Sequence, residues 1–91
     1  DVDYWEINEA FAAQFLGVGR MLKEESGIEL DMNKCNINGS GIALGHPVGC
    51  TGLRIIVSMY YELEKQGKTL GGASLCVGGG MAMASLWSRD V

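Results

Sequence analysis

The chain has 91 residues, of which 47% are apolar and 20% charged, and its formal net charge is −4. That length suffices for one small domain with a core but not for two. The 7 basic residues, against 11 acidic ones, form no cluster, which argues against nucleic acid as a partner. No apolar run is long enough to span a bilayer, so a membrane partner is not expected either.

The cysteines Cys35, Cys50 and Cys76 are odd in number and show no CxxC or Cys/His metal spacing. They are predicted to be thiols of a reducing compartment, which favours a cytoplasmic location, and no metal site is predicted. The chain begins with Asp1 rather than Met, and a strand is expected almost at once. Residues 1–91 are therefore expected to be a single partial domain cut from a longer protein.

The first third of the chain predicts a strand and a helix. Residues 3–7 favour a short strand, after which Asn8 can cap a helix that begins near Glu9. Gly27 follows the polar end of that helix, at the position where glycine is favoured. The helix is expected to bury one apolar stripe of residues at helical spacing, formed by Phe11, Phe15, Val18 and Leu22.

The middle of the chain predicts a second strand and a second helix. Residues 34–37 favour a short strand, and the glycine-rich stretch 38–52 follows as a loop. The helix is predicted to start at residues 49–51, to run to Gln66 and to end at Gly67. Its expected buried face consists of Leu53, Ile56, Val57, Tyr60 and Leu63.

The last segment predicts a hairpin. Residues 70–77 and 81–87 favour strands, and the glycines at 78–80 leave a turn short enough to force antiparallel pairing. The stripe of Met81, Met83 and Trp87 is expected to lie in the core. The element order β-α-β-α-β-β predicts an α/β fold, with a mixed sheet of three parallel strands and an antiparallel last strand.

Three segments are expected to meet at one end of this sheet. Ligands of open α/β sheets bind beyond the carboxyl ends of the parallel strands. Residues 8–11, 39–52 and 76–78 each follow or end a predicted parallel strand, and they carry Asn8, His46 and Cys76 respectively. The topology alone therefore predicts a site to which these three side chains contribute.

His46 is the only histidine, and Pro47 after it disfavours helical backbone at the histidine. An imidazole can take a proton from a thiol, or donate one to a developing oxyanion, near neutral pH. A histidine that only hydrogen-bonds its own loop is the alternative. The motif by itself leaves both interpretations open.

Cys76 stands between Leu75 and Val77, and a buried structural thiol is the more common explanation of such a cysteine. Its place at a strand end, beside the backbone N–H groups of a glycine run, would also suit a thiolate or an oxyanion. For Cys35 and Cys50 a structural role is favoured more strongly. Cys50 remains a second candidate for a reactive thiol, because the dipole at a helix N-terminus favours a thiolate there.

Asn8 and Glu9 have simple structural explanations at the start of the first helix, as N-cap and first-turn acid. An Asn8 amide that faces the site and holds a water or a substrate carbonyl is possible, but spacing does not reveal it. The glycines at 78–80 do not form a phosphate-binding loop, because the GxxxxGK[ST] pattern is absent.

Three motifs together resemble the thiolase family, over nearly all 91 residues and in the family's order. They are Asn8-Glu9-Ala10-Phe11-Ala12, residues 38–49 (NGSGIALGHPVG) and Cys76-Val77-Gly78-Gly79-Gly80. The resemblance implies the C-terminal half of a paired α/β fold, of which this chain would form the last four strands. It also implies an acyl-CoA C-acyltransferase, which condenses acetyl-CoA or cleaves 3-ketoacyl-CoA with CoA. Such an enzyme needs no bound cofactor, since the CoA thioesters are its substrates.

The resemblance also implies roles for individual residues. His46 would activate a nucleophilic cysteine and help form the first oxyanion hole, in which Asn8 would hold a water. Cys76 would be the general acid/base at the α-carbon of the second acyl group. The N–H of Gly78 would serve the second oxyanion hole.

In the family, residues matching Ala10 and Phe11 line the channel for pantetheine. No segment of this chain resembles the part of a thiolase that carries the nucleophile, so the chain alone is expected to be inactive. A homo-oligomer is expected from the family. Two alternatives remain: a ketoacyl-synthase-like condensing enzyme, or a non-catalytic fragment for CoA binding or assembly.

Overall fold

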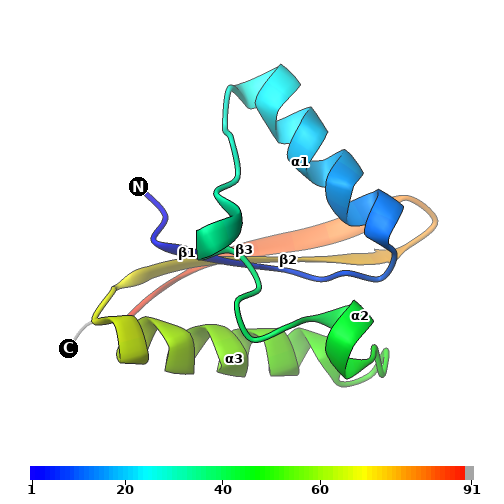
Figure 1. Cartoon of the computed structure of the whole chain (residues 1–91). Coiled ribbons are helices and arrows are strands. Elements are labelled where there is room, and N and C mark those ends of the chain that lie inside the picture. The colour runs from blue at the N-terminus through cyan, green and yellow to red at the C-terminus, as the bar shows by residue number, and fades with distance from the viewer. Residues whose placement is uncertain (90–91) are drawn as a thin grey trace.

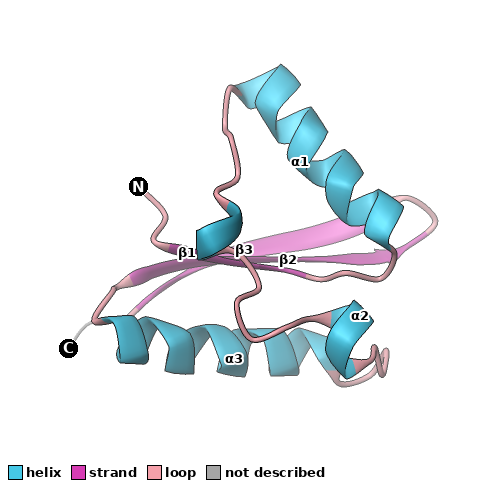
Figure 2. Ribbon diagram, in the orientation of Figure 1, coloured by secondary structure: helices cyan, strands magenta, loops and turns pink. Residues whose placement is uncertain are grey.

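The computed structural model describes residues 1–89, which form a three-stranded sheet with helices on both sides (Figure 1). The long helix α3 lies along one face, while α1 stands at an angle over the other. The α/β class and the mixed sheet with an antiparallel last strand are thereby confirmed (Figure 2). The elements are β1 (Tyr4–Ile7), α1 (Ala12–Ser26), the 3-10 turn η1 (Met32–Lys34), α2 (Gly41–Leu44), α3 (Thr51–Gln66), β2 (Leu70–Gly78) and β3 (Met81–Ser88).

The strand order is β1-β2-β3, with β2 in the middle. β1 pairs with β2 in parallel, so that Tyr4 lies opposite Gly71. β2 pairs with β3 antiparallel through a turn in which Gly79 and Gly80 have φ angles of 59° and 83°. Two residues with positive φ give a turn whose twist matches that of the strands, and glycine adopts such angles without strain. The predicted hairpin is confirmed.

The strand predicted at residues 34–37 is wrong. The chain makes one 3-10 turn, and only Cys35 forms a bridge, in parallel with Trp5 of β1. Asn36 then takes a φ of 49°, which ends any extended backbone. Its side chain replaces the missing ladder, because Oδ1 accepts from the Ile7 N–H at 2.9 Å and Nδ2 donates to the Ile7 carbonyl at 2.7 Å.

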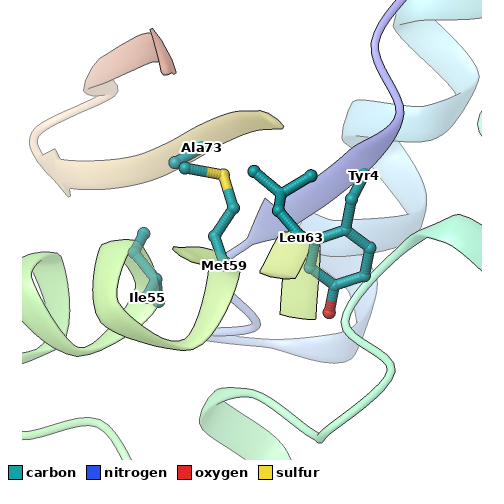
Figure 3. Packing of buried hydrophobic residues seen from close by; sticks show 5 residues of the cluster. All are labelled: Tyr4, Ile55, Met59, Leu63 and Ala73. Atoms are coloured by element: carbon teal, nitrogen blue, oxygen red, sulfur yellow. The ribbon is translucent and has the colours of Figure 1, made fainter. Parts of the chain in front are cut away.

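The main core lies between α3 and the sheet. In Figure 3, Met59 extends from α3 to Ala73 of β2, and Leu63 lies beside the ring of Tyr4 from β1. Full burial of a side chain the size of Leu or Met contributes about 1.5–3 kcal/mol, so this layer fixes α3 on the sheet. The buried cluster is Tyr4, Ile55, Met59, Leu63 and Ala73.

The bounds predicted for α3 are confirmed, including its end at Gly67, which has a φ of 66°. The predicted buried face is right for Leu63 and, in part, for the half-buried Ile56. It is wrong for three apolar residues that remain exposed in this chain: Leu53, Val57 and Tyr60. Because apolar residues surround this helix on more than one side, periodicity did not identify which stripe faces the sheet.

The opposite face of the sheet holds a smaller cluster of Ile7, Phe15 and Cys35. α1 contributes Phe15 to it, whereas Phe11 is 74% exposed and Val18 and Leu22 are half-buried. α1 begins at Ala12, not near Glu9, so the prediction that Asn8 caps it is wrong. The side-chain Oε1 of Gln14 accepts from the Phe11 N–H at 3.5 Å instead. The helix ends at Gly27 as predicted.

β3 has little covering it. Met81, Met83 and Trp87 are all exposed, so their predicted place in the core is wrong for this chain.

None of the helices within residues 1–89 is both long and apolar enough to cross a membrane.

Candidate active site

One groove of about 790 Å³ lies where β1 and β2 end. Helix α1, the loop after α2 and the β2–β3 hairpin all contribute to its wall, and most of that wall is apolar. Five of the six predicted site residues line it: His46, Cys76, Gly78, Ala10 and Phe11. The full lining is Ala10, Phe11, Gln14, Val18, His46, Val48, Ser74, Leu75, Cys76, Val77, Gly78, Gly80, Met81 and Ala82.

His46 is held through one of its two ring nitrogens. Nδ1 lies 2.8 Å from the Thr51 hydroxyl oxygen, at the first residue of α3. The same hydroxyl donates to the Pro47 carbonyl at 3.0 Å. The loop that carries His46 is therefore closed onto the start of α3, and the ring is half-buried at the edge of the groove.

Asn8 is the sixth predicted site residue, and it lies behind His46. Its side chain is 1% exposed, and Nδ2 is 3.4 Å from His46 Nδ1. Asn8 Oδ1 is buried and has no hydrogen-bond partner among residues 1–89. A buried amide oxygen without a partner costs free energy.

Glu9 and Asn36 connect the end of β1 to the glycine-rich loop. Asn36 Nδ2 donates to Glu9 Oε2 at 3.0 Å, and the Ile42 N–H donates to Glu9 Oε1 at 3.4 Å. The prediction that Glu9 belongs to the first turn of α1 is therefore wrong. Its carboxylate orders the loop that leads to His46.

Gly41 packs directly against this same point. A Cβ at Gly41 would lie 2.4 Å from the Glu9 carbonyl oxygen and 3.3 Å from Asn8 Oδ1. Only a residue without a side chain allows the loop to approach the backbone of β1 this closely. The glycine at this position thus sets the distance between the Asn8 and His46 segments.

A buried polar network supports the loop from below. The Tyr4 hydroxyl donates to Glu6 Oε2 at 2.6 Å and accepts from the Ile37 N–H at 2.8 Å. Arg54 Nη1 lies 3.7 Å from Glu6 Oε1, and Nη2 donates to the Ser40 hydroxyl at 3.2 Å. Burial raises the pKa of Glu6 above its usual value, while Tyr4 and Arg54 act to lower it.

Cys76 lies on the other side of the groove, near the end of β2. It pairs with Ala82 of β3 just before an irregularity in the register at Gly78. Its thiol is free and half-buried. Gly78 has a φ of 143°, and both residues line the groove directly beside the hairpin turn.

The other two cysteines lie outside this groove. Cys35 is buried, and burial raises the pKa of its thiol to about 12, so it stays protonated near neutral pH. Cys50 is exposed and precedes α3. Within residues 1–89, no group of three or more His, Cys, Asp or Glu side chains is placed to hold a metal ion.

Sequence reasoning missed Thr51, Asn36 and Arg54 as supports of the site. Thr51 reads as an ordinary first residue of a helix. Asn36 lies in a segment that was predicted to be extended, and the pairing of Arg54 with Glu6 joins residues that are 48 positions apart. Local signals of spacing and capping do not reveal such contacts, because they depend on how the strand and helix pack.

A histidine, a thiol and backbone N–H groups around one largely apolar groove are the groups that base-assisted chemistry at a carbonyl carbon requires. A sequence model of the thiolase C-terminal domain matches residues 1–89. The chain therefore belongs to the thiolase family, and residues 1–89 match its C-terminal domain.

Individual relatives agree. The chain is 48% identical over 89 residues to an acetyl-CoA acetyltransferase from Escherichia coli K12, an alignment that covers 98% of this chain and 21% of the relative. It is 45% identical over 89 residues to a 3-ketoacyl-CoA thiolase from Hahella chejuensis, covering 98% of this chain and 22% of the relative. The chain thus spans about a fifth of the length of these relatives.

Solved structures show the same fold. The structure of an acetyl-CoA acetyltransferase from Syntrophomonas wolfei is 82% identical, with a TM-score of 0.94, over 99% of this chain and 23% of that one. Human mitochondrial 3-ketoacyl-CoA thiolase is 43% identical, with a TM-score of 0.84, over 97% of this chain and 21% of that one.

Proposed function

We propose that this chain supplies part of the active site of an acyl-CoA C-acyltransferase, which condenses acetyl-CoA or cleaves a 3-ketoacyl-CoA with CoA. The observation that carries the proposal is the convergence of the three motif segments. His46, Cys76 and Gly78, from different parts of the sequence, line one groove together with Ala10 and Phe11. Relatives named as acetyl-CoA acetyltransferases and 3-ketoacyl-CoA thiolases support the reaction class.

In the first step, His46 takes the proton of a nucleophilic thiol located elsewhere in the enzyme. The thiolate attacks the thioester carbonyl, the C–S bond to CoA breaks, and CoA leaves as a thiol after it receives a proton. The hydrogen bond between Thr51 and Nδ1 of the ring supports this role, because it fixes one nitrogen of a histidine that lines the groove and leaves the other free. Asn8, beside His46, is suited to hold a water at the carbonyl oxygen.

In the second step, Cys76 removes a proton from the α-carbon of a second acyl-CoA. The resulting carbanion attacks the acyl-enzyme, and the nucleophilic thiolate is released. A base close to that carbon and an N–H donor at the carbonyl oxygen are what this step requires. The positions of Cys76 and Gly78 side by side on the groove support both assignments.

Ala10 and Phe11 form an apolar part of the groove wall, which suits the pantetheine arm of CoA. No bound cofactor is needed, since the CoA thioester supplies the activated carbonyl. The three free cysteines support a reducing compartment such as the cytoplasm.

Exposed apolar side chains support coverage by further chain or by a second subunit. Tyr61 of α3 and Met83 and Leu86 of β3 are each more than 60% exposed. Contiguous exposed apolar surface marks an interaction site in most soluble proteins. A homo-oligomeric complete enzyme is consistent with this surface.

A non-catalytic fragment that binds CoA or assembles is the second candidate. The proposed role of Ala10 and Phe11 is compatible with this candidate, since these residues would bind CoA without taking part in catalysis. It does not explain why the hydroxyl of a buried threonine holds the single histidine at the groove.

The test compares the chain alone with the chain in a complete enzyme. In the graft, residues 1–91 replace the corresponding segment of the acetyl-CoA acetyltransferase from Syntrophomonas wolfei, which is 82% identical over this region. Acetoacetyl-CoA thiolysis is measured for both proteins after circular dichroism. We expect turnover by the graft close to that of its host and none by the chain alone.

Turnover by the chain alone would mean that one of its own cysteines acts as the nucleophile, and the division of roles would be wrong. An inactive but folded graft would favour the non-catalytic alternative. The host enzyme without the graft serves as the positive control.

A further inference from the structure

The contact between Thr51 and His46 determines where the imidazole carries its proton. Thr51 is completely buried at the start of α3. Its hydroxyl has one hydrogen, and this hydrogen is donated to the Pro47 carbonyl at 3.0 Å. The oxygen is therefore an acceptor toward His46 Nδ1, which lies 2.8 Å away.

An acceptor at that distance requires a hydrogen on Nδ1. In a neutral imidazole only one nitrogen is protonated, so Nε2 then has a free lone pair. Within residues 1–89, the polar contacts of the ring are both at Nδ1. Nε2 is thus the nitrogen left free in a histidine that lines the groove.

The assignment also fixes the orientation of the Asn8 amide. As placed, its Nδ2 lies 3.4 Å from Nδ1, 0.6 Å farther than the Thr51 oxygen. A protonated Nδ1 offers this N–H donor no acceptor, so the assignment requires the amide oxygen on this side. Asn8 Oδ1 has no partner among the described residues. A half-turn of the amide exchanges the two atoms and would let Oδ1 accept from the Nδ1 hydrogen.

We infer that Thr51 is a positioning residue that keeps the proton of neutral His46 on Nδ1, so that Nε2 acts as the base toward a thiol. This inference rests on the proposed function for the identity of the proton donor. The tautomer itself is inferred from the contacts of Thr51 and does not depend on the proposed function.

The kinetic test uses Thr51→Val and Thr51→Ser in the graft. Valine keeps the β-branched shape and removes the acceptor, whereas serine keeps the hydroxyl. We expect Thr51→Val to lower kcat about 10- to 100-fold, since a well-placed general base contributes about 10²–10⁴-fold. KM should change less than about threefold, and Thr51→Ser should restore most of kcat. Thr69→Val, the same change at the exposed second threonine, is the matched control.

The direct test is ¹⁵N NMR of histidine-labelled graft, in which the His46 signal is identified by its loss in His46→Asn. We expect a protonated Nδ1 and a bare Nε2 in the unsubstituted graft and in Thr51→Ser. Thr51→Val should shift the population toward protonation of Nε2. A proton on Nε2 in the unsubstituted graft would overturn the inference, even if Thr51→Val does not fold.

The two measurements separate this inference from the proposed function. A tautomer shift together with a fall in kcat supports both. A tautomer shift with unchanged kcat supports the role of Thr51 and overturns that of His46 as base. An unchanged tautomer in folded Thr51→Val overturns the role of Thr51.

Discussion

The two sides of the groove are built differently. On the histidine side, Glu9 accepts hydrogen bonds from Asn36 and from the loop, and His46 is held to the start of α3. On the cysteine side, Cys76 and the glycine turn extend on a hairpin whose outer strand is exposed along most of its length. The histidine side is therefore preorganised by this chain itself.

The difference shows which part of the site depends on the rest of the protein. Buried hydrogen-bonded networks restrict side chains to few arrangements, and the histidine side has such a network apart from Glu6 Oε1 and Asn8 Oδ1, which have no hydrogen-bond partner within residues 1–89. An exposed apolar hairpin has no such internal support, and its relatives are about five times as long as this chain. Substitutions on the histidine side should thus act on this domain directly, whereas those on the hairpin should act through whatever covers it.

The largest effect is expected from Gly41→Ala. The new Cβ would lie 2.4 Å from the Glu9 carbonyl oxygen, a backbone atom that cannot rotate away. We expect a loss of about 3 kcal/mol in the free energy of unfolding of the graft, at the upper end of the usual cost of overpacking. Urea unfolding measures it. Gly17→Ala in α1, where a Cβ meets nothing within 4 Å, is the control, and an equal loss there would contradict the explanation.

A smaller effect is expected from Glu9→Gln. The amide keeps one acceptor oxygen and replaces the other by an NH₂ group, so either Asn36 Nδ2 or the Ile42 N–H loses its partner. Hydrogen bonds to a charged group are worth about 1.5–3 kcal/mol. We expect the free energy of unfolding, measured in urea, to fall by an amount near the lower end of this range. Activity should fall as well, since the loop carries His46. Unchanged stability and activity would show that Glu9 does not order the loop.

Glu6→Gln should change how stability depends on pH. Because the pKa of Glu6 is raised in the folded state, the native protein binds more protons than the unfolded chain above the normal glutamate pKa. The parent graft should therefore lose stability as pH rises from about 4.5, the ordinary glutamate pKa, toward the raised pKa, and Glu6→Gln should lack that loss. The difference between the two proteins in unfolding free energy at a series of pH values measures it. A parallel pH dependence of the two would contradict the shift.

The smallest effect is expected from Met83→Ser on the hairpin. Met83 is 73% exposed, so in the chain alone the substitution should change the unfolding free energy by less than about 0.5 kcal/mol. In the graft we expect a larger loss, because host chain is predicted to cover the apolar face of β3. Equal effects in both proteins would show that this face stays exposed in the complete enzyme.

Much of the fold could be predicted from local signals. Gly27 and Gly67 mark the ends of the two long helices, and the glycines at 78–80 predict the antiparallel hairpin. The strand prediction for residues 34–37 was wrong, because the side chain of Asn36, rather than a paired strand, forms the hydrogen bonds to the backbone of Ile7. The buried face of α3 was mistaken because its second apolar face has no partner within these residues.

The candidate site was predictable to the extent that topology brings its segments together. His46, Cys76 and Gly78 do line one groove, while their chemical roles stay predictions. Asn8 was explained as a helix cap, and its place behind His46 could not be foreseen because the start of α1 lies three residues later than capping signals suggest. The role of Thr51 could not be predicted, because its contact with His46 exists only in the folded loop.

The most direct measurement is single-turnover acylation of the graft by radiolabelled acetyl-CoA, in Cys76→Ala and in His46→Asn. If the two sides of the groove serve different steps, Cys76→Ala will form the acyl-enzyme at nearly the parent rate and then fail to turn over. His46→Asn will form it at least about 100-fold more slowly, because it lacks the base. Normal acylation by His46→Asn, or sustained turnover by Cys76→Ala, would contradict the assignment of the two sides.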